Sequence, residues 1–345
     1  MFDAVKHYES LYQAVHREFA FCAKSKEEFV DWQSKFRPRL CEVLGLTNME
    51  ADLSKHQPTA EMRTSTDMGT YIREEWHLWV EPTVPLPFYF LHPKEQSDTP
   101  RPLVLTPHGH NHPYIYVGIS QSEDERKSIE EGQRDIAVQA VNEGYMVIAA
   151  TTRGFGETRT KSDAENNRVS SCRIELMHGL LVGRTAIGER VWDISRLIDW
   201  ATSRDDVDAK RIAITGNSGG GTISVFAPAC DTRISVAVPS CYFCTFEGSI
   251  GSIHHCDCNY VPGIMRLGEM YDVAGLIAPR PFKAIAGKDD TIFPIEPVKY
   301  AFERLKEIYT VADVPDNCQL YIGEYGHRYY KDGAWGFIRH HFEKL

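Results

Sequence analysis

Residues 211–222 read Arg-Ile-Ala-Ile-Thr-Gly-Asn-Ser-Gly-Gly-Gly-Thr, and this stretch decides the fold. The apolar and β-branched residues 212–215 predict a buried strand, and a segment compatible with a helix follows the glycines. Between them, residues 216–220 match the Gly-x-Ser-x-Gly pattern of a nucleophile elbow, a sharp turn that projects a serine hydroxyl from the sheet. The flanking glycines leave room for such a turn around Ser218. This order of elements predicts an α/β fold with a reactive serine.

A glycine-rich turn between a strand and a helix can also bind a phosphate. A P-loop, however, ends in Gly-Lys-Ser or Gly-Lys-Thr, and no lysine stands near these glycines. Upstream, apolar residues of the segment 191–201 recur at helical spacing, and the polar turn 204–208 leads into the strand. This succession of helix, turn, strand and elbow favours a catalytic serine over a phosphate site.

A serine hydroxyl needs a histidine base, and the histidine needs a carboxylate to orient it. In α/β-hydrolases the acid and then the histidine follow the serine along the chain. Residues 282–287 read as a buried strand, and Asp289 and Asp290 stand in the loop after it. Residues 319–322 read as a further strand, and His327 follows in the next loop. We therefore predict His327 as the base and one of the two aspartates as its partner.

The second half of an oxyanion hole is expected in the loop after an earlier strand. Residues 102–107 read as this strand, and His-Gly-His follows it. Because Gly109 lets the backbone turn, we predict that the N–H groups of His110 and Gly219 stabilise the oxyanion. The alternate histidines in 108–112 also suggest a metal site, but no carboxylate stands near them. We expect no metal here.

These motifs resemble those of the α/β-hydrolase superfamily from about residue 70 onward, and most of all those of dienelactone-hydrolase-like and acetyl-xylan-esterase-like bacterial esterases. The shared features are the elbow, His108-Gly109, Arg153-Gly154-Phe155-Gly156, Gly287-x-x-Asp290-x-x-x-Pro294 and Gly326-His327. In the family, the acid lies three residues after the glycine and four before the proline. The resemblance therefore favours Asp290 over Asp289 and implies a triad of Ser218, Asp290 and His327.

The chain also departs from this family. Its carbohydrate deacetylases usually have Arg-Gly-Gln, a glutamine after the serine, and His-Glu at the end. Here Phe155, Gly219 and Arg328 stand at those positions. The resemblance thus supports the fold and the triad more strongly than membership of the deacetylase family.

The predicted fold is an α/β-hydrolase fold with a mostly parallel eight-stranded sheet and helices on both faces. The expected strands are residues 71–80, 86–92, 102–107, 145–151, 211–215, 234–239, 282–287 and 318–322. The first two read as an antiparallel pair, and the later ones alternate with helical segments. Residues 1–65 are predicted to form a helical N-terminal extension packed on the core. Residues 66–345 form the catalytic domain, with a cap-like insert around 241–275.

The insert is rich in cysteine, histidine and aromatic residues. Cys241-x-x-Cys244 and His254-His-Cys256-x-Cys258 could ligate zinc. We favour reduced thiols without metal, because Cys-x-Cys is less typical of zinc sites and the total of nine cysteines is odd. Tyr242 and His255 are predicted to contact the substrate.

Composition and charge narrow the function further. A net charge of −10 argues against nucleic acid or an anionic membrane as partner. The first residues lack the basic and apolar regions of a signal peptide, so we expect a cytoplasmic protein. A homo-oligomer is compatible with the sequence.

We predict a serine esterase that removes short, acetyl-type acyl groups from a small-molecule ester, such as an acetylated carbohydrate, without a cofactor. Two alternatives remain open. A prolyl-oligopeptidase-like peptidase would share the triad, although 345 residues leave no space for that family's propeller. The other is a zinc-stabilised binding protein without catalysis.

Overall fold

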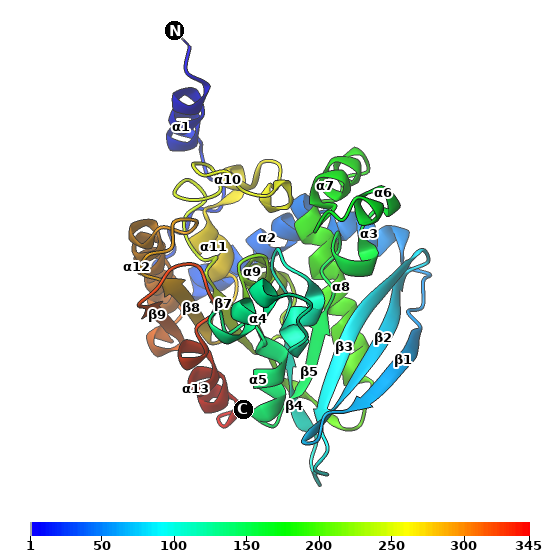
Figure 1. Ribbon diagram of the computed structural model, residues 1–345. Coiled ribbons are helices and arrows are strands. Elements are labelled where there is room, and N and C mark those ends of the chain that lie inside the picture. The colour runs from blue at the N-terminus through cyan, green and yellow to red at the C-terminus, as the bar shows by residue number, and fades with distance from the viewer. Residues whose placement is uncertain (1) are drawn as a thin grey trace.

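The computed structural model describes residues 2–345, which form a nine-stranded sheet in the order β1-β2-β3-β5-β4-β6-β7-β8-β9 (Figure 1). The strands are β1 (Ala60–Asp67), β2 (Tyr71–Glu81), β3 (Val84–Pro93), β4 (Arg101–Leu105), β5 (Met146–Ala150), β6 (Val207–Asn217), β7 (Val236–Ser240), β8 (Phe282–Gly287) and β9 (Cys318–Gly323). β1, β2 and β3 are antiparallel, β3 pairs antiparallel with β5, and the pairs from β5 to β9 are parallel. The predicted α/β-hydrolase fold is confirmed.

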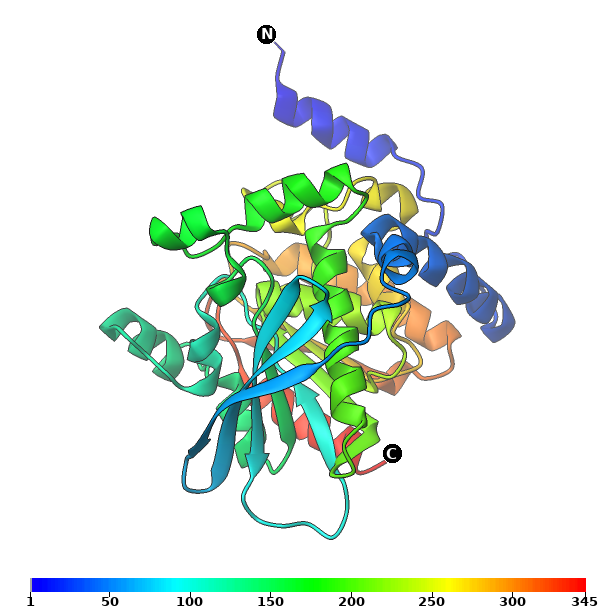
Figure 2. The same ribbon diagram turned by 90° about the vertical axis from the view of Figure 1, so that its right-hand side faces the viewer.

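The strand that the sequence analysis missed is β1, so the predicted count of eight was one too low. All eight of its residues are exposed, and it pairs only with β2 at the edge of the sheet (Figure 2). Only its first four residues, Ala-Glu-Met-Arg, alternate between apolar and polar, which is too short a pattern to predict a strand. It begins at Ala60, inside the range 1–65 that was predicted to be helical. The pairing register shifts between Met62 and Thr64.

Helices cover both faces of the sheet (Figure 1). They are α1 (Ala4–Ala14), α2 (Lys26–Leu44), α3 (Leu46–Asp52), α4 (Glu123–Glu130), α5 (Ile136–Asn142), α6 (Lys161–Glu165), α7 (Cys172–Leu181), α8 (Ala186–Thr202), α9 (Gly219–Cys230), α10 (Ile264–Leu267), α11 (Met270–Gly275), α12 (Ile295–Val311) and α13 (Lys331–Phe342). Side chains alternate along the central strands: Leu103 and Leu105 pack toward α2, α8 and α9, whereas Val104 packs toward α5 and α13. Two apolar cores result, one on each face.

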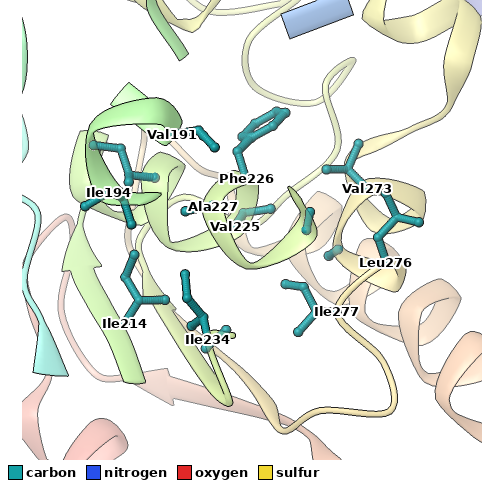
Figure 3. Packing of buried hydrophobic residues seen from close by; sticks show 14 of the residues in the cluster. Val191, Ile194, Ile214, Val225, Phe226, Ala227, Ile234, Val273, Leu276 and Ile277 are labelled. Atoms are coloured by element: carbon teal, nitrogen blue, oxygen red, sulfur yellow. The ribbon is translucent and has the colours of Figure 1, made fainter. Parts of the chain in front are cut away.

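The helix that follows the serine lies deep in the larger core (Figure 3). Val225 and Phe226 of α9 are fully buried, with Ile194 of α8 on one side and Val273 of α11 on another. Burying each such side chain contributes roughly 1.5–3 kcal/mol. The turn at Ser218 is therefore anchored by a helix that cannot shift without opening the core.

The N-terminal segment contains two helices of different character. In α2, buried residues recur at helical spacing from Phe29 to Leu44, and Ser25 caps the helix by accepting a hydrogen bond from the Glu28 N–H at 3.2 Å. In α1 no residue is buried, and the helix stands away from the body (Figures 1 and 2). Within residues 2–345, no helix has both the length and the apolar character needed to cross a membrane.

The predicted insert around 241–275 divides into two parts. After β7 the chain runs through a loop with one short 3-10 helix, η3 (Asp257–Asn259), to α10. Its last helix, α11, is fully buried in the larger core. The loop before α10 starts at the carboxyl end of β7, the edge of the sheet where β6 also ends.

Candidate active site

Ser218 occupies a strained backbone conformation between β6 and α9. Its φ is +59° and its ψ is −118°, a region that residues other than glycine rarely adopt. The two glycines make the turn possible by allowing close approach. A Cβ on Gly216 would lie 2.4 Å from the Pro107 carbonyl oxygen and 2.9 Å from the Gly220 Cα. A Cβ on Gly220 would lie 2.0 Å from the same oxygen, so neither position tolerates a side chain.

The loop after β4 touches the start of α9. A Cβ on Gly109 would be 3.3 Å from the Ser218 Cβ and 3.4 Å from the Gly219 nitrogen. Gly219 is the first residue of α9, so its N–H has no acceptor within the helix. The backbone of residues 109 and 110 and the positive end of the helix dipole thus meet beside the serine.

The buried side chain of His108 holds the loop after β4 in place through two hydrogen bonds. It is 1% exposed; its Nε2 accepts a hydrogen bond from the Thr152 N–H at 2.9 Å, and its Nδ1 lies 2.7 Å from the Gly109 carbonyl oxygen. One nitrogen accepts and the other donates, which is the pattern of a neutral imidazole. Burial lowers the pKa of His108 to about 3, so the ring is uncharged at neutral pH.

Asp290 and His327 are hydrogen-bonded partners. The Asp290 Oδ2 accepts from the His327 Nδ1 at 2.8 Å, and Oδ1 accepts from the N–H groups of Ile292 and Phe293 at 2.8 and 3.1 Å. Burial by itself raises the pKa of Asp290, but these hydrogen bonds outweigh it and the net pKa is lowered. The carboxylate is therefore ionised and holds the imidazole in one orientation. The neighbouring Asp289 is exposed.

Ser240 and Cys241, at the end of β7, lie between the serine and the Asp290–His327 pair. The Ser218 N–H donates to the Ser240 carbonyl oxygen at 2.9 Å, where β6 and β7 end. The next residue, Cys241, has its sulfur within 4.8 Å of both the Asp290 carboxylate and a His327 ring nitrogen. That thiol donates to the Arg328 carbonyl oxygen at 3.1 Å. The three residues predicted to act together therefore gather at one edge of the sheet.

The two residues predicted to contact substrate lie in different surroundings. His255 is 8% exposed; its Nε2 lies 2.9 Å from the Ser249 Oγ, and its ring is 5.3 Å from the Phe293 ring. Phe293 also stacks on His327, so His255 stands close to the candidate base. Tyr242 is only 1% exposed and packs beneath this layer. The predicted substrate contact of Tyr242 is wrong, because a ring that is only 1% exposed offers no surface to a substrate.

The side chain of His110 is exposed, but its Nε2 lies close to cysteine sulfurs. Its Nε2 lies 3.3 Å from the Cys258 sulfur and 4.0 Å from the Cys172 sulfur, and the Cys256 sulfur is 3.4 Å from that of Cys258. The sequence analysis grouped Cys256 with Cys258, gave His110 a role only in the oxyanion hole, and did not connect Cys172 with any of them. Cys244, which the same spacing grouped with Cys241, is fully buried elsewhere beside Met270.

Sequence reasoning also missed a buried ionic network behind the site. Arg153 pairs with Asp193 at 2.7 Å and with Glu81 at 2.6 Å, all with side chains less than a tenth exposed. Arg190 lies beside it, donating to the Glu175 carboxylate at 2.9 Å and to the Arg153 carbonyl oxygen at 3.0 Å. These pairs fasten the loop after β5 to α8 and β2. A buried charge that loses its partner is strongly destabilising, so this loop is held firmly.

Known proteins share both this fold and parts of this sequence. Residues 125–260 match the family model "Acetyl xylan esterase (AXE1)". The chain is 28% identical to "Putative hydrolase YtaP" of Bacillus subtilis (strain 168) over 249 residues, which cover 70% of this chain and 77% of that protein.

Two solved structures are similar in fold. A putative acetyl xylan esterase from Bacteroides fragilis NCTC 9343 superposes with a TM-score of 0.78 at 17% identity, over 97% of this chain and 84% of that one. A glucuronoyl esterase from Solibacter usitatus superposes with a TM-score of 0.63 at 14% identity, over 91% and 92% of the two chains.

The sheet order and the solved structures show an α/β-hydrolase fold. The proteins that are similar in sequence are an esterase family, over residues 125–260, and a hydrolase. The predicted resemblance to α/β-hydrolase-type esterases is confirmed.

Proposed function

We propose that the chain is a serine esterase in which Ser218 is the nucleophile, His327 the general base and Asp290 the carboxylate that orients it. The observation that carries this proposal is the 2.8 Å hydrogen bond between Asp290 and His327 at the same sheet edge as the strained serine. Because Nδ1 of His327 is bonded to Asp290, Nε2 is the nitrogen left to accept a proton.

The reaction would proceed through an acyl-enzyme. The Ser218 oxygen attacks the ester carbonyl while His327 takes its proton, and the N–H groups of Gly219 and His110 donate hydrogen bonds to the resulting oxyanion. When the intermediate collapses, His327 returns the proton to the leaving alcohol. Water, deprotonated by His327, then releases the acid and restores the serine.

For the substrate we propose a short acyl ester of a carbohydrate, acetyl first. The match to the acetyl xylan esterase model over the elbow and the loops beside it supports this choice. The imidazole of His255, which packs against Phe293 beside His327, would place a hydrogen-bonding group near the serine. Such a group suits a sugar hydroxyl better than a long aliphatic chain.

A second candidate places the sugar on the acyl side of the ester. The similarity in fold to glucuronoyl esterases, which covers most of both chains, supports esters of a uronic acid as substrates. Both candidates use the same serine chemistry. They differ in whether the carbohydrate leaves as the alcohol or remains on the enzyme as the acyl group.

Labelling and kinetics test the proposal together. A fluorophosphonate probe should label the wild-type chain at Ser218 and should fail to label Ser218→Ala. The ratio kcat/KM should fall along p-nitrophenyl acetate, butyrate and octanoate, and acetylated xylose should be preferred over methyl glucuronate. Labelling of Ser218→Ala would overturn the nucleophile; a rise toward octanoate would overturn the short-acyl proposal; a preference for methyl glucuronate would establish the second candidate.

A further inference from the structure

Four side chains from three separate segments converge beside the elbow. His110 comes from the loop after β4, Cys172 is the first residue of α7, and Cys256 and Cys258 flank the start of η3. One nitrogen and three sulfurs of this set lie within 4.8 Å of one another, and Cys172 and Cys258 are each 2% exposed. We call these four residues the thiol–imidazole cluster.

The separations match those of a tetrahedral metal site. With Zn–S bonds of about 2.3 Å and Zn–N bonds of about 2.0–2.1 Å, a tetrahedron has edges of about 3.8 Å between sulfurs and about 3.6 Å between sulfur and nitrogen. The cluster has a sulfur–sulfur distance of 3.4 Å and nitrogen–sulfur distances of 3.3 and 4.0 Å. Each lies within about 0.4 Å of the corresponding edge.

We propose that His110, Cys172, Cys256 and Cys258 bind one Zn²⁺ ion as a structural Cys₃His site. The donor set is complete at four, which is the coordination number of closed structural zinc sites. Three sulfurs and an imidazole are soft ligands that select zinc over magnesium or calcium. This assignment goes against the expectation from the sequence, where Cys256-x-Cys258 stood without its two remote partners.

The charge around the cluster agrees with this proposal. Three thiolates, a neutral imidazole and Zn²⁺ carry a net charge of −1. Arg190 is 4% exposed; its Nη2 donates to the Cys172 sulfur at 3.4 Å, and its buried Nε has no acceptor in the described chain. This buried guanidinium lies between the Glu175 carboxylate, at 2.9 Å, and the sulfurs, so it places positive charge beside both.

An ion pair at the surface also joins two of the segments. Arg173, the residue after Cys172, forms an ion pair at 3.0 Å with Asp257, which lies between Cys256 and Cys258. This pair joins the start of α7 to η3 independently of the sulfurs. The second group of potential ligands, around Asp290, is different, because its histidine and carboxylate are already paired with each other.

The ion would tie the His110 loop to the insert. Resting on the proposed function, this means that zinc positions the His110 N–H that donates to the oxyanion, so His110 serves by its side chain as a ligand and by its backbone as a donor. The metal itself takes no part in the reaction steps. Removing it should loosen one half of the oxyanion hole and leave the Asp290–His327 pair in place.

Metal analysis of the full chain tests the site directly. We expect one equivalent of zinc per chain, either as purified or after Zn²⁺ is added to the reduced protein and excess metal is removed by gel filtration. Cobalt should bind at the same stoichiometry and give the thiolate-to-cobalt charge-transfer absorption of a tetrahedral sulfur site. Cys256→Ser/Cys258→Ser should lose both signals.

A matched control separates this cluster from thiols in general. Cys41 and Cys230 are a second pair of neighbouring thiols far from the elbow. Cys41→Ser/Cys230→Ser should keep the zinc and the cobalt absorption. If the double variant of the cluster fails to fold, His110→Ala provides the second test, because loss of the imidazole should alter the cobalt spectrum while the thiolate-to-cobalt absorption of the three remaining cysteines persists.

Three results would overturn the assignment. Reduced protein that binds neither zinc nor cobalt would show that the cluster is only packed thiols. A Cys256–Cys258 disulfide found by mass spectrometry of freshly purified, alkylated protein would assign the cluster to redox chemistry. Zinc retained by the cluster variant would place the ion elsewhere. If zinc binds but Ser218 is not labelled, the metal site stands and the proposed function falls.

Discussion

Two histidines at the same edge of the sheet, His110 and His327, look alike in the sequence and differ in the folded chain. Each follows a strand and a glycine. The ring of His327 is hydrogen-bonded to a buried carboxylate at 2.8 Å, whereas the ring of His110 faces sulfur atoms at 3.3 and 4.0 Å. The comparison teaches that the partner atom, and not the local sequence, decides what a loop histidine can do.

The two partners leave different nitrogens free. Asp290 engages Nδ1 of His327, so Nε2 is available for proton transfer. The sulfurs lie against Nε2 of His110, so this nitrogen is the one that is placed to hold a metal. Variants that remove one partner or one ring therefore test whether the two halves of the site are independent.

The largest effect is expected from removing the base. His327→Ala should lower kcat by about 10⁴-fold or more, because the serine loses its proton acceptor. His110→Ala keeps its backbone N–H and should lower kcat by only about ten- to a hundred-fold. Steady-state kinetics on p-nitrophenyl acetate measures both. Equal losses in the two variants would contradict the division of roles.

The two adjacent aspartates provide the next test. Asp290→Asn keeps the size of the side chain but favours the wrong imidazole tautomer, so kcat should fall by about 10³- to 10⁴-fold. Asp289→Asn changes an exposed side chain and should alter kcat by less than about two-fold. The pair of variants differs only in position. If Asp289→Asn were the less active of the two, the role given to Asp290 would be wrong.

A third histidine, His108, sharpens the comparison through pH. Its pKa is lowered from the ordinary value of 6.5 to about 3, so below pH 6.5 the unfolded chain takes up a proton that the folded chain does not. Stability is therefore present above pH 6.5 and lost as the pH falls toward 3. From pH 7.5 to 5, this single group should cost about 2 kcal/mol of unfolding free energy.

Urea denaturation at a series of pH values measures this effect. His108→Gln cannot titrate but keeps an acceptor for the Thr152 N–H, so its stability should depend less on pH than that of the wild type by about that amount. His255 and His341 also have lowered pKa values, and their contribution is common to both proteins. Identical pH profiles would show that the pKa of His108 does not differ between the folded and the unfolded chain.

The smallest effect is expected at the first residue of α9. A Cβ on Gly219 would lie 3.2 Å from the His110 Nδ1 and 3.3 Å from the Gly109 Cα, so Gly219→Ala should push the His110 loop by a few tenths of an ångström. We expect kcat/KM to fall by less than about ten-fold, with labelling of Ser218 retained. Gly336→Ala is the control, because a Cβ there meets no atom within 4 Å. An unchanged kcat/KM in Gly219→Ala would show that the loop does not contribute to the oxyanion hole.

The sequence was sufficient where function depends on local pattern. Two glycines at fixed spacing identify the elbow around Ser218 in the sequence, and the structure gives the steric reason for both. The positions of strands β2 to β9 along the chain follow from apolar runs that each end in a turn. The choice of Asp290 over Asp289 came from the resemblance to the family pattern, and burial of one and exposure of the other agree with it.

The sequence was insufficient where function depends on contacts between remote segments. Cys172 precedes Cys256 by 84 positions and follows His110 by 62, so no motif could join them. The burial of Tyr242 depends on the packing of α9 beneath it. The partners of Arg153 come from β2 and α8, and no spacing rule relates them.

The exposed strand β1 has a consequence for the chain at high concentration. An outermost strand offers unpaired N–H and C=O groups to a second sheet, which is a common start of aggregation. Here the register shift between Met62 and Thr64 bends this edge strand, and Glu61 and Arg63 place charges of both signs beside the bend. A neighbouring molecule would have to flatten the bend and strip water from both charges before it could add a strand. These features of β1 therefore disfavour pairing between the edge strands of two molecules at high protein concentration.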